Sequence, residues 1–237
     1  MNFPAVAFDR CGDRGENVND MDTVRTVVND VSDCGRQFRP KPVYDLFKRI
    51  FDIIASLTGM IVLSPVFLVT AAAILIEDGG CPFYVQERIG QGGKPFRMYK
   101  FRSMVKNAED GLGQLMESNE YRCVHFKMEN DPRITRVGKI IRPVSIDELP
   151  QLLNVLIGNM SVIGPRPFIA SEQEQLPSDR LSVKPGLSCY WQTANTLKMS
   201  SEQQLELDYR YIRERSVVTD IKIILRTLVV IVRGKNQ

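Results

Sequence analysis

The chain contains few of the residues from which metal and disulfide sites are built. Its 237 residues include one histidine and five cysteines, and no two cysteines form a C-x-x-C pair. Scattered cysteines in odd number favour neither a zinc site nor a disulfide framework, and they fit a reducing compartment best. The single histidine, His125, lies beside Phe126, and we give it no role because a lone histidine is more often a packed or surface residue. The cysteines are Cys11, Cys34, Cys81, Cys123 and Cys189.

The chain also lacks a strong excess of charge. Its formal net charge is +3, and 43% of its residues are hydrophobic. A nucleic-acid-binding protein is expected to carry a clearly basic surface, so we expect no nucleic-acid partner. The hydrophobic fraction is large enough for one substantial core.

The first part of the chain is poor in periodic apolar residues. Residues 1–40 are rich in Asp, Asn, Gly and Arg, and no apolar segment follows the start. We therefore expect no signal peptide here. The composition predicts a mobile N-terminal arm over residues 1–42, which ends at the "RPKP" of residues 39–42.

One long segment carries no charge. Residues 53–76 lack charged side chains over 24 positions, a length that can span a bilayer. Ser64 and Pro65 lie at its middle, where a proline removes a backbone donor and bends a helix. Both flanks are basic, and positive flanks favour the cytoplasmic side. We expect a re-entrant helix-break-helix hairpin over residues 43–78, with one kinked spanning helix as the alternative.

The remainder of the chain is polar and contains three basic clusters. Residues 87–104 place a Gly-rich turn between two short mixed segments, and the alternation in "FRMYKFRSM" predicts a strand. Further basic residues occur in residues 131–143 and in the "GPRP" of residues 164–167. Prolines on both sides of Arg166 make a stiff turn that can aim a guanidinium at a phosphate, although such turns are more often plain surface loops.

An acidic pair lies among these basic clusters, in the "SIDELPQ" of residues 145–151. Ser145 and Glu148 have the spacing of a capping box, but Pro150 would then fall where the helix needs a backbone donor. We therefore expect the helix to begin at Asp147 or close to it, with both carboxylates at the positive end of its dipole. Such acids are usually plain caps, yet the same place attracts phosphate or a phosphate-bound cation.

The last segment of the chain is amphipathic. In residues 220–235, basic residues such as Lys222 and Arg226 lie at helical spacing against Ile221 and Leu225. The segment is too short and too charged to span a membrane. It either packs on the core or lies in the membrane interface with its basic face toward anionic headgroups.

These motifs, taken in order, resemble one known family. The "SP" within an apolar segment, "QERIG", "KFRSM", the block from "DPRITRVGKIIRP" through "GPRP", and the late "ELDYRYI" are similar to the bacterial sugar transferases. These are monotopic phosphoglycosyl transferases, which start polysaccharide or glycan assembly on a polyprenyl phosphate. The resemblance covers about residues 43–233, and its long ordered block is far more specific than a lone acidic pair.

The resemblance implies a fold and a location. We expect a helix-rich α+β protein with a re-entrant membrane hairpin and a compact cytoplasmic catalytic domain over residues 79–237. That domain should hold a small sheet and interfacial amphipathic helices. The implied location is the bacterial cytoplasmic (inner) membrane, with membrane lipids as partners and the catalytic domain facing the cytoplasm.

The resemblance also implies a reaction. A sugar 1-phosphate passes from a UDP-sugar to undecaprenyl phosphate through a covalent aspartyl intermediate, and UMP leaves. In the family the aspartate of the acidic pair is the nucleophile, here Asp147, with Glu148 as its partner near Mg²⁺. Attack of an anion on an anion needs charge cancellation from a metal and from basic side chains. The expected phosphate contacts are Arg142, Arg166, Lys100, Arg102 and Pro167.

One segment departs from the family pattern, and one other class of function stays open. Residues 184–196 read "KPGLSCYWQTANT", where family members often have a Gly-rich stretch, so donor specificity cannot be carried over. A non-catalytic membrane-anchored adaptor with a basic cytoplasmic face would use the same hairpin but would not require Asp147, Glu148 and Arg166 together. The sugar, the polymer and any homo-oligomer are not determined by the sequence.

Overall fold

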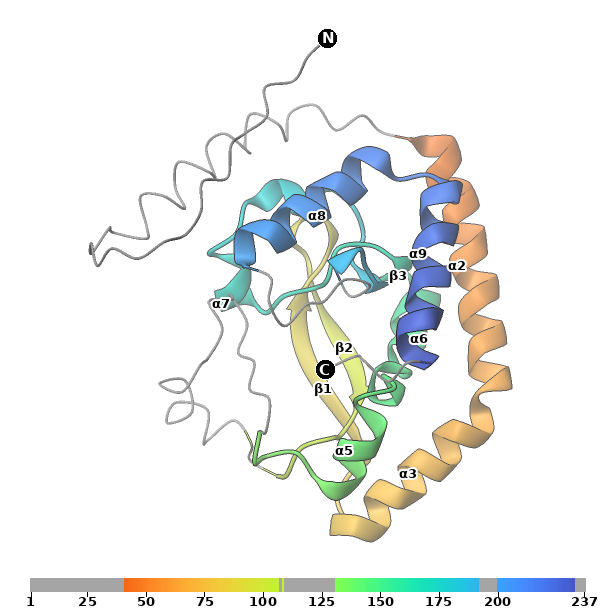
Figure 1. Cartoon of the computed structure of the whole chain (residues 1–237), viewed down its shortest axis with the longest axis vertical. Helices are drawn as coiled ribbons and strands as arrows, with labels where there is room; N and C mark the ends of the chain where they lie inside the picture. The colour runs from red at the N-terminus through yellow and green to blue at the C-terminus, as the bar shows by residue number, and fades with distance from the viewer. Residues whose placement is uncertain (1–40, 107, 109–130, 192–199, 233–237) are drawn as a thin grey trace, which may run out of the picture.

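The computed structural model describes residues 41–106, 108, 131–191 and 200–232 (Figure 1). The predicted arm, apart from residues 41 and 42, and His125 lie outside these residues. The prediction of a helix-rich α+β fold is confirmed, with two two-stranded sheets. The elements are α2 (Pro42–Val62), α3 (Ser64–Asp78), β1 (Phe83–Ile89), η1 (Gln91–Gly93), β2 (Pro95–Phe101), α5 (Arg136–Ile141), η2 (Ile146–Glu148), α6 (Gln151–Ile157), β3 (Ser161–Ile163), α7 (Ala170–Gln173), η3 (Ser178–Ser182), β4 (Gly186–Ser188), α8 (Ser201–Glu214) and α9 (Val217–Val232).

The predicted break in the apolar segment is present. α2 ends at Val62, α3 begins at Ser64, and the two helices are bent by 60°. Pro65 lies in the first turn of α3, where its missing N–H costs nothing, and the Ser64 hydroxyl donates to the carbonyl of Ile61 (2.8 Å). Among the described residues no single helix has the length and apolarity to cross a membrane, but this bent pair passes on length and composition.

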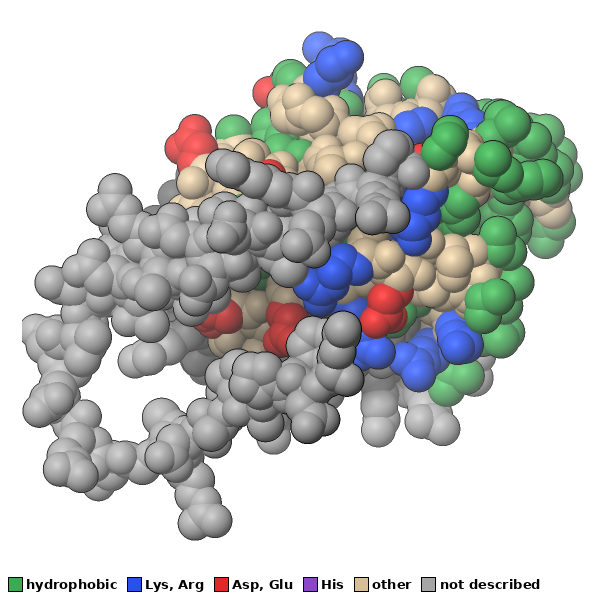
Figure 2. Space-filling model, turned by 90° about the horizontal axis from the view of Figure 1, so that it is seen from above, with side chains coloured by type: hydrophobic (Ala, Val, Ile, Leu, Met, Phe, Trp, Pro, Cys, Tyr) green, Lys and Arg blue, Asp and Glu red, His purple; other side chains and the backbone are tan. Residues whose placement is uncertain are grey.

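α2 has its apolar face on the outside of the protein. Val43, Leu46, Phe47, Ile50 and Ile54 are all exposed on it, between 47% and 68% of their surface. Figure 2 shows hydrophobic side chains gathered on the side of the molecule that α2 and α3 occupy in Figure 1. An apolar surface of this extent marks contact with a membrane or another protein rather than with water.

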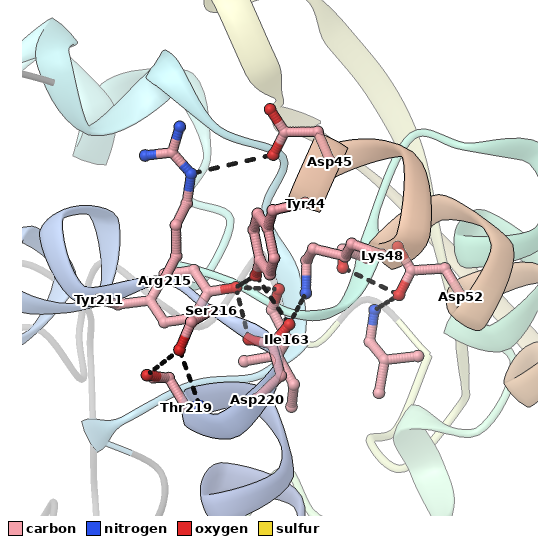
Figure 3. A network of polar contacts seen from close by, with 12 residues as sticks. Tyr44, Asp45, Lys48, Asp52, Ile163, Tyr211, Arg215, Ser216, Thr219 and Asp220 are labelled. Atoms are coloured by element: carbon pink, nitrogen blue, oxygen red, sulfur yellow. Dashed lines mark hydrogen bonds and ion pairs between the residues drawn. The ribbon is translucent and has the colours of Figure 1, made fainter. Parts of the chain in front are cut away.

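The inner face of α2 is polar and is tied to the rest of the protein. Asp220, in the first turn of α9, accepts hydrogen bonds from Tyr44 (2.8 Å), Lys48 (2.8 Å) and Tyr211 (3.0 Å). The Tyr211 hydroxyl also lies 3.0 Å from the carbonyl of Ile163 on β3. This network, shown in Figure 3, joins α2, α8, α9 and β3 at one buried carboxylate.

Three further side chains of this inner face bond elements that are distant in the sequence. Their partners are two helix C-termini and strand β3, so the contacts satisfy backbone groups that would otherwise lack partners. Lys41 Nζ donates to the carbonyls of Arg213 (3.1 Å) and Arg215 (2.8 Å) at the end of α8. Arg49 donates to the carbonyls of Val155 (2.7 Å) and Leu156 (2.8 Å) at the end of α6. Asp52 Oδ1 accepts from Ser161 Oγ and from the N–H of Val162 (3.0 Å each) on β3.

The predicted strand and the Gly-rich turn within residues 87–104 are confirmed, and they belong to a β-hairpin. β1 and β2 pair antiparallel from Phe83 opposite Phe101 to Ile89 opposite Pro95, and η1 connects them. The alternation in β2 buries Phe96 and Met98, which belong to one core cluster with Val155 of α6. Phe101, on the opposite face of the strand, is buried in another cluster with Ile74 of α3.

Asn154 aligns α6 with the free edge of β2. Its side-chain amide donates to the carbonyl of Arg97 (2.6 Å) and accepts from the N–H of Tyr99 (3.0 Å). The side chain thus takes the place of a neighbouring strand, and it is completely buried. Since the acidic pair precedes α6 and Lys100 lies on β2, this bridge sets the spacing between them.

The "GPRP" loop begins where β3 and β4 cross closely. β3 and β4 pair in parallel, Ser161 with Gly186 and Ile163 with Ser188. A Cβ on Gly164 would collide with the backbone at Lys184, and one on Gly186 would collide with Gly164. Both glycines are therefore required by the close backbone approach that holds this loop.

The prediction that the amphipathic C-terminal helix packs on the core is confirmed, and the alternative of a membrane-interface helix stays a prediction. α9 packs one face on the core, where Ile223 is completely buried. The opposite face leaves apolar side chains exposed beside Lys222 and Arg226. The exposed residues are Val217, Val218, Ile221, Leu225, Leu228 and Val229.

We predict that Asn154→Leu destabilises the protein by about 2–4 kcal/mol. The substitution leaves one buried donor and one buried acceptor of β2 without partners, and each typically costs about 1–3 kcal/mol. Denaturant unfolding in detergent micelles measures the change. Asn159→Leu is the matched control, because Asn159 is exposed, and it should change stability by less than about 0.5 kcal/mol. Equal effects of the two substitutions would contradict the bridging role of Asn154.

Candidate active site

The acidic pair lies in a separate turn before the helix. Asp147 and Glu148 belong to the 3₁₀ turn η2, and α6 begins only at Gln151. The prediction of a helix start at or near Asp147 is therefore wrong. Ser145 has a left-handed backbone (φ 56°) and does not cap the turn, and Pro150, which has no N–H to donate, directly precedes α6. The carboxylates are thus free from a capping role and are available for other contacts.

Glu148 is held by two cations. Its Oε1 accepts from Lys100 Nζ (2.9 Å) and lies 3.4 Å from a guanidinium nitrogen of Arg166. Burial alone would raise the pKa of Glu148, but the charges of Lys100 and Arg166 outweigh it and lower the pKa to about 2. Glu148 is therefore the anion that aligns both cations.

Asp147 differs from its neighbour. Among the described residues its carboxylate has no hydrogen-bond or ion-pair partner. Burial and the adjacent charge of Glu148 raise the pKa of Asp147 to about 6, against the opposing effect of Lys100, Arg142 and Arg166. A half-buried carboxylate with open lone pairs, surrounded by cations, can act as a nucleophile or as a metal ligand.

The predicted phosphate contacts are brought together only in part. Lys100 and Arg166 contact Glu148 directly, and Arg142, at the end of α5, is close enough to lower the pKa of Asp147. Arg102 instead pairs with Asp78 at the end of α3, away from the acidic pair. The carbonyl of Pro167 accepts from Arg88 (3.4 Å).

α3 helps to position Arg142. The carboxylate of Glu77, in the last turn of α3, accepts from the backbone N–H groups of Arg136 (2.7 Å) and Val137 (3.2 Å) at the start of α5. Thr135 caps the same helix through the N–H of Gly138 (2.9 Å). Because α5 is only six residues long, these two caps determine where its last residue and Arg142 lie.

Arg166 is fixed from behind by a buried ion pair. The guanidinium of Arg180 donates to the backbone carbonyl of Arg166 (2.8 Å) and to Asp208 (2.7 Å), and it stacks 4.6 Å from the ring centre of Phe168. The side chains of Arg180 and Asp208 are 1% and 4% exposed. The guanidinium of Arg166 itself lies over the ring of Trp191, 5.6 Å from its centre.

Arg88 is a site residue that the sequence reading did not single out. It bonds Glu172 (3.3 Å), and burial together with the charge of Arg166 lowers its pKa to about 10. Its Nε is buried without a partner among the described residues. The sequence signal that could have identified Arg88 is its place in "QERIG". Arg88 lies two positions after Gln86 on the same strand, and it contacts the amide oxygen of Gln86 (2.5 Å). A second arginine beside Arg166 makes the site a place for an added anion.

Within the described ranges, no three acidic, histidine or cysteine side chains are close enough to form a metal cluster. Part of the segment that departs from the family pattern lies beside the site. Cys189 is buried with Phe168 and Trp191 next to Arg166, and Ser188 bonds Thr227 on α9 (2.6 Å). Residues 192–196 of this segment lie outside the described residues.

Comparison with known proteins gives one consistent result. The family model described as "Bacterial sugar transferase" matches residues 43–234. The chain is 42% identical over 191 residues to the galactosyl transferase CpsE of Streptococcus agalactiae, covering 79% of this chain and 42% of CpsE. It is 36% identical over 196 residues to the exopolysaccharide production protein ExoY of Rhizobium meliloti, covering 79% of this chain and 86% of ExoY.

A third relative carries a more specific name. The undecaprenyl-phosphate galactose phosphotransferase of Salmonella typhimurium is 38% identical over 193 residues, which cover 78% of this chain. The match spans 40% of that protein, so this chain corresponds to less than half of the Salmonella relative and of CpsE, but to most of ExoY.

We predict that Asp208→Ala destabilises the protein by about 3–5 kcal/mol, because it leaves the buried charge of Arg180 without compensation. The exposed pair Arg210–Glu214 on the same helix supplies the control, since its side chains are 56% and 48% exposed. Glu214→Ala should cost less than about 0.5 kcal/mol. Thermal and urea unfolding of both variants give the comparison, and similar costs at the two positions would show that Arg180 does not depend on Asp208.

Proposed function

Because the chain belongs to the bacterial sugar transferase family, we propose that it transfers a sugar 1-phosphate from a UDP-sugar to undecaprenyl phosphate and releases UMP. Relatives are named for undecaprenyl-phosphate sugar phosphotransfer and for exopolysaccharide production, which supports this substrate pair. The observation that carries the proposal is Asp147, a carboxylate without a partner among the described residues, beside Glu148, which aligns Lys100 and Arg166.

The reaction proceeds in two displacements at one phosphorus atom. A carboxylate oxygen of Asp147 attacks the sugar-proximal phosphorus, and the bond to the oxygen of UMP breaks, so that UMP leaves with the electron pair. A phosphate oxygen of undecaprenyl phosphate then attacks the same phosphorus and displaces Asp147 as a carboxylate. No net proton is transferred in either step. A carboxylate nucleophile divides one difficult displacement into two easier ones.

The cations around Asp147 reduce the repulsion between nucleophile and substrate. Arg166 is held from behind by Arg180 and Lys100 by Glu148, so both are in place before the donor binds. Charges that need no reorganisation at the moment of reaction are the most effective in lowering the barrier. Arg142 and Arg88 provide further positive charge for the diphosphate of the donor.

We assign Mg²⁺ to the same acidic pair. Carboxylate oxygens are the ligands that Mg²⁺ prefers, and it usually takes one or two of them together with water and substrate phosphates. Asp147 and Glu148 would supply these two carboxylates, and Asp147 has no protein partner among the described residues. The ion supplies further neutralisation of phosphate charge when bound.

The outward apolar surface of α2 and α3 supports a location in the cytoplasmic membrane. A re-entrant arrangement, with both ends of the bent pair on the cytoplasmic face, would hold the acidic pair near the plane where the phosphate of the lipid acceptor lies. An adaptor would share this anchor, but it would have no use for an open carboxylate among four cations.

We predict that Asp147→Asn abolishes turnover while the fold stays intact. The amide cannot form the acyl phosphate, and loss of a covalent route typically lowers the rate by several orders of magnitude. Stability should change by less than about 1 kcal/mol, because Asp147 neither caps a helix nor has a partner among the described residues. UMP release from a panel of UDP-sugars, with Mg²⁺ and undecaprenyl phosphate, measures the activity.

Mass spectrometry separates the covalent route from direct transfer. Without the lipid acceptor, wild-type protein should carry a phosphosugar on the peptide that contains Asp147, and Asp147→Asn should not. Glu148→Gln should also lose most of its activity but keeps the nucleophile. Substantial turnover by Asp147→Asn at unchanged stability would rule out the covalent mechanism.

We predict a re-entrant topology that depends on Pro65. Native cysteines report on both ends: Cys34 in the arm, and Cys81, which is exposed just after α3. We propose two variants, one that keeps only Cys34 and one that keeps only Cys81. In each variant the remaining cysteine should react with an impermeant reagent from the cytoplasmic side alone. Pro65→Ala should straighten the pair and move Cys34 toward periplasmic labelling, whereas Pro177→Ala should not. Periplasmic labelling of Cys34 in the wild-type protein would exclude the re-entrant arrangement.

A further inference from the structure

A cavity bordered by several charged side chains lies at the junction of α2 with the rest of the protein. Its volume is about 160 Å³, and it opens between the first half of α2, β3, the segment before β4 and the end of α8. None of the side chains around Asp147 and Glu148 lines it. The network of Figure 3 forms one of its walls, through Tyr44, Lys48 and Tyr211. The remaining lining residues are Asp45, Arg49, Asp52, Gln91, Ser161, Ile163, Ser182, Val183, Lys184 and Arg215.

The lining carries more positive than negative charge. Four cationic side chains border the cavity, and two carboxylates do. Lys48 is paired with Asp220 (2.8 Å) and Arg215 with Asp45 (3.9 Å), whereas the guanidinium of Arg49 donates to the uncharged carbonyls of Val155 and Leu156. The charge of Arg49 is therefore not cancelled by the groups that it bonds.

Lys184 is the cation with most binding capacity left. Among the described residues its ammonium group has no hydrogen-bond or ion-pair partner, so three donors are open. Burial and the charge of Arg49 lower its pKa, and Asp52 offsets them only in part. One oxygen of Asp52 already accepts from Ser161 and Val162. Two cations thus face one cavity with a single, shared carboxylate between them.

We propose that this cavity binds a phosphate group, with Lys184 as its main ligand and the charge of Arg49 as support. A phosphate oxygen accepts charge-assisted hydrogen bonds from an ammonium group, and its negative charge balances the excess in the lining. The hydroxyl of Ser182 borders the same cavity and adds an uncharged donor, and Gln91 holds this segment in place by donating from its amide to the carbonyl of Ser182 (3.0 Å). The site is separate from the proposed reaction centre and does not depend on it.

Two kinds of ligand could supply a phosphate group with this chemistry. It is either the headgroup of an anionic lipid or a free soluble phosphate. The cavity lies on the inner side of α2, whose outer side is apolar, and α9 exposes Val217, Val218 and Ile221 beside the same junction. Apolar surfaces on both helices can carry the acyl chains of a lipid whose headgroup reaches Lys184.

Calorimetric titration of the full-length protein in neutral detergent micelles tests the proposal. The probes are inorganic phosphate, dihexanoyl phosphatidylglycerol as the anionic lipid, and dihexanoyl phosphatidylcholine as the zwitterionic lipid. We expect saturable binding of at least one of the first two probes and weaker binding of phosphatidylcholine. Lys184→Gln should weaken the binding about tenfold or more, as expected for loss of a charged hydrogen bond.

Three control variants make the outcome specific. Lys184→Arg keeps the charge and should bind within a few-fold of wild type, and Lys94→Gln removes an exposed lysine outside the cavity and should bind normally. Asp147→Asn, which disables the proposed chemistry, should also bind normally, so the two proposals fail independently. Saturation by phosphatidylglycerol alone identifies a lipid, and saturation by phosphate identifies a soluble ligand. Absence of saturable binding, or equal affinity of Lys184→Gln and wild type, would overturn the site.

Discussion

The arrangement of the other helices depends on how α2 is bonded to them through one face while its other face stays exposed. Its outer face is apolar and exposed, while its inner face places Tyr44, Lys48 and Asp52 against α8, α9 and β3. Asp220 is the centre of this contact, because one buried carboxylate accepts from a lysine and two tyrosines. A carboxylate buried in this way stays in place only if all these donors are present, so the orientation of α2 is specified by directional bonds.

The candidate site extends this arrangement through α6. Arg49 on α2 bonds the carbonyls at the end of α6, and Asn154 in the middle of α6 bonds the edge of β2. The acidic pair lies just before α6, and Lys100 lies on β2. Hydrogen bonds through α6 therefore connect α2 to the contact between Glu148 and Lys100. Arg166 is held independently, by the buried pair of Arg180 and Asp208.

Much of this organisation could be predicted from the sequence, because it depends on local signals. The break at Pro65 follows from one missing backbone donor, and the hairpin follows from glycines between alternating segments. The acidic pair, Lys100 and Arg166 were identified through ordered motifs, and the structure brings them together. Arg102 was grouped with them by its position in "KFRSM", but β2 ends at Phe101, and Arg102 pairs with Asp78 at the end of α3.

The remaining features could not be read from one sequence, because their causes are contacts between distant segments. α6 begins only at Gln151, after a separate 3₁₀ turn, and no local motif predicts this turn or the left-handed backbone of Ser145. Arg88 and Arg166 lie close together in the site, although they are 78 positions apart in the sequence. The bonds of Asn154 to β2 and of Arg180 to the carbonyl of Arg166 span 57 and 14 positions. Hydrophobic periodicity gives no information about which buried polar groups will meet.

The cap that Glu77 places on α5 has a mechanical consequence. Glu77, in the last turn of α3, bonds the first N–H groups of α5, and Arg142 directly follows the last residue of α5, about 9 Å further along. The position of α5, and with it that of Arg142, therefore depends on the position of α3. Any displacement of α3 would therefore be passed through Glu77 to α5 and would shift the guanidinium of Arg142 relative to Asp147.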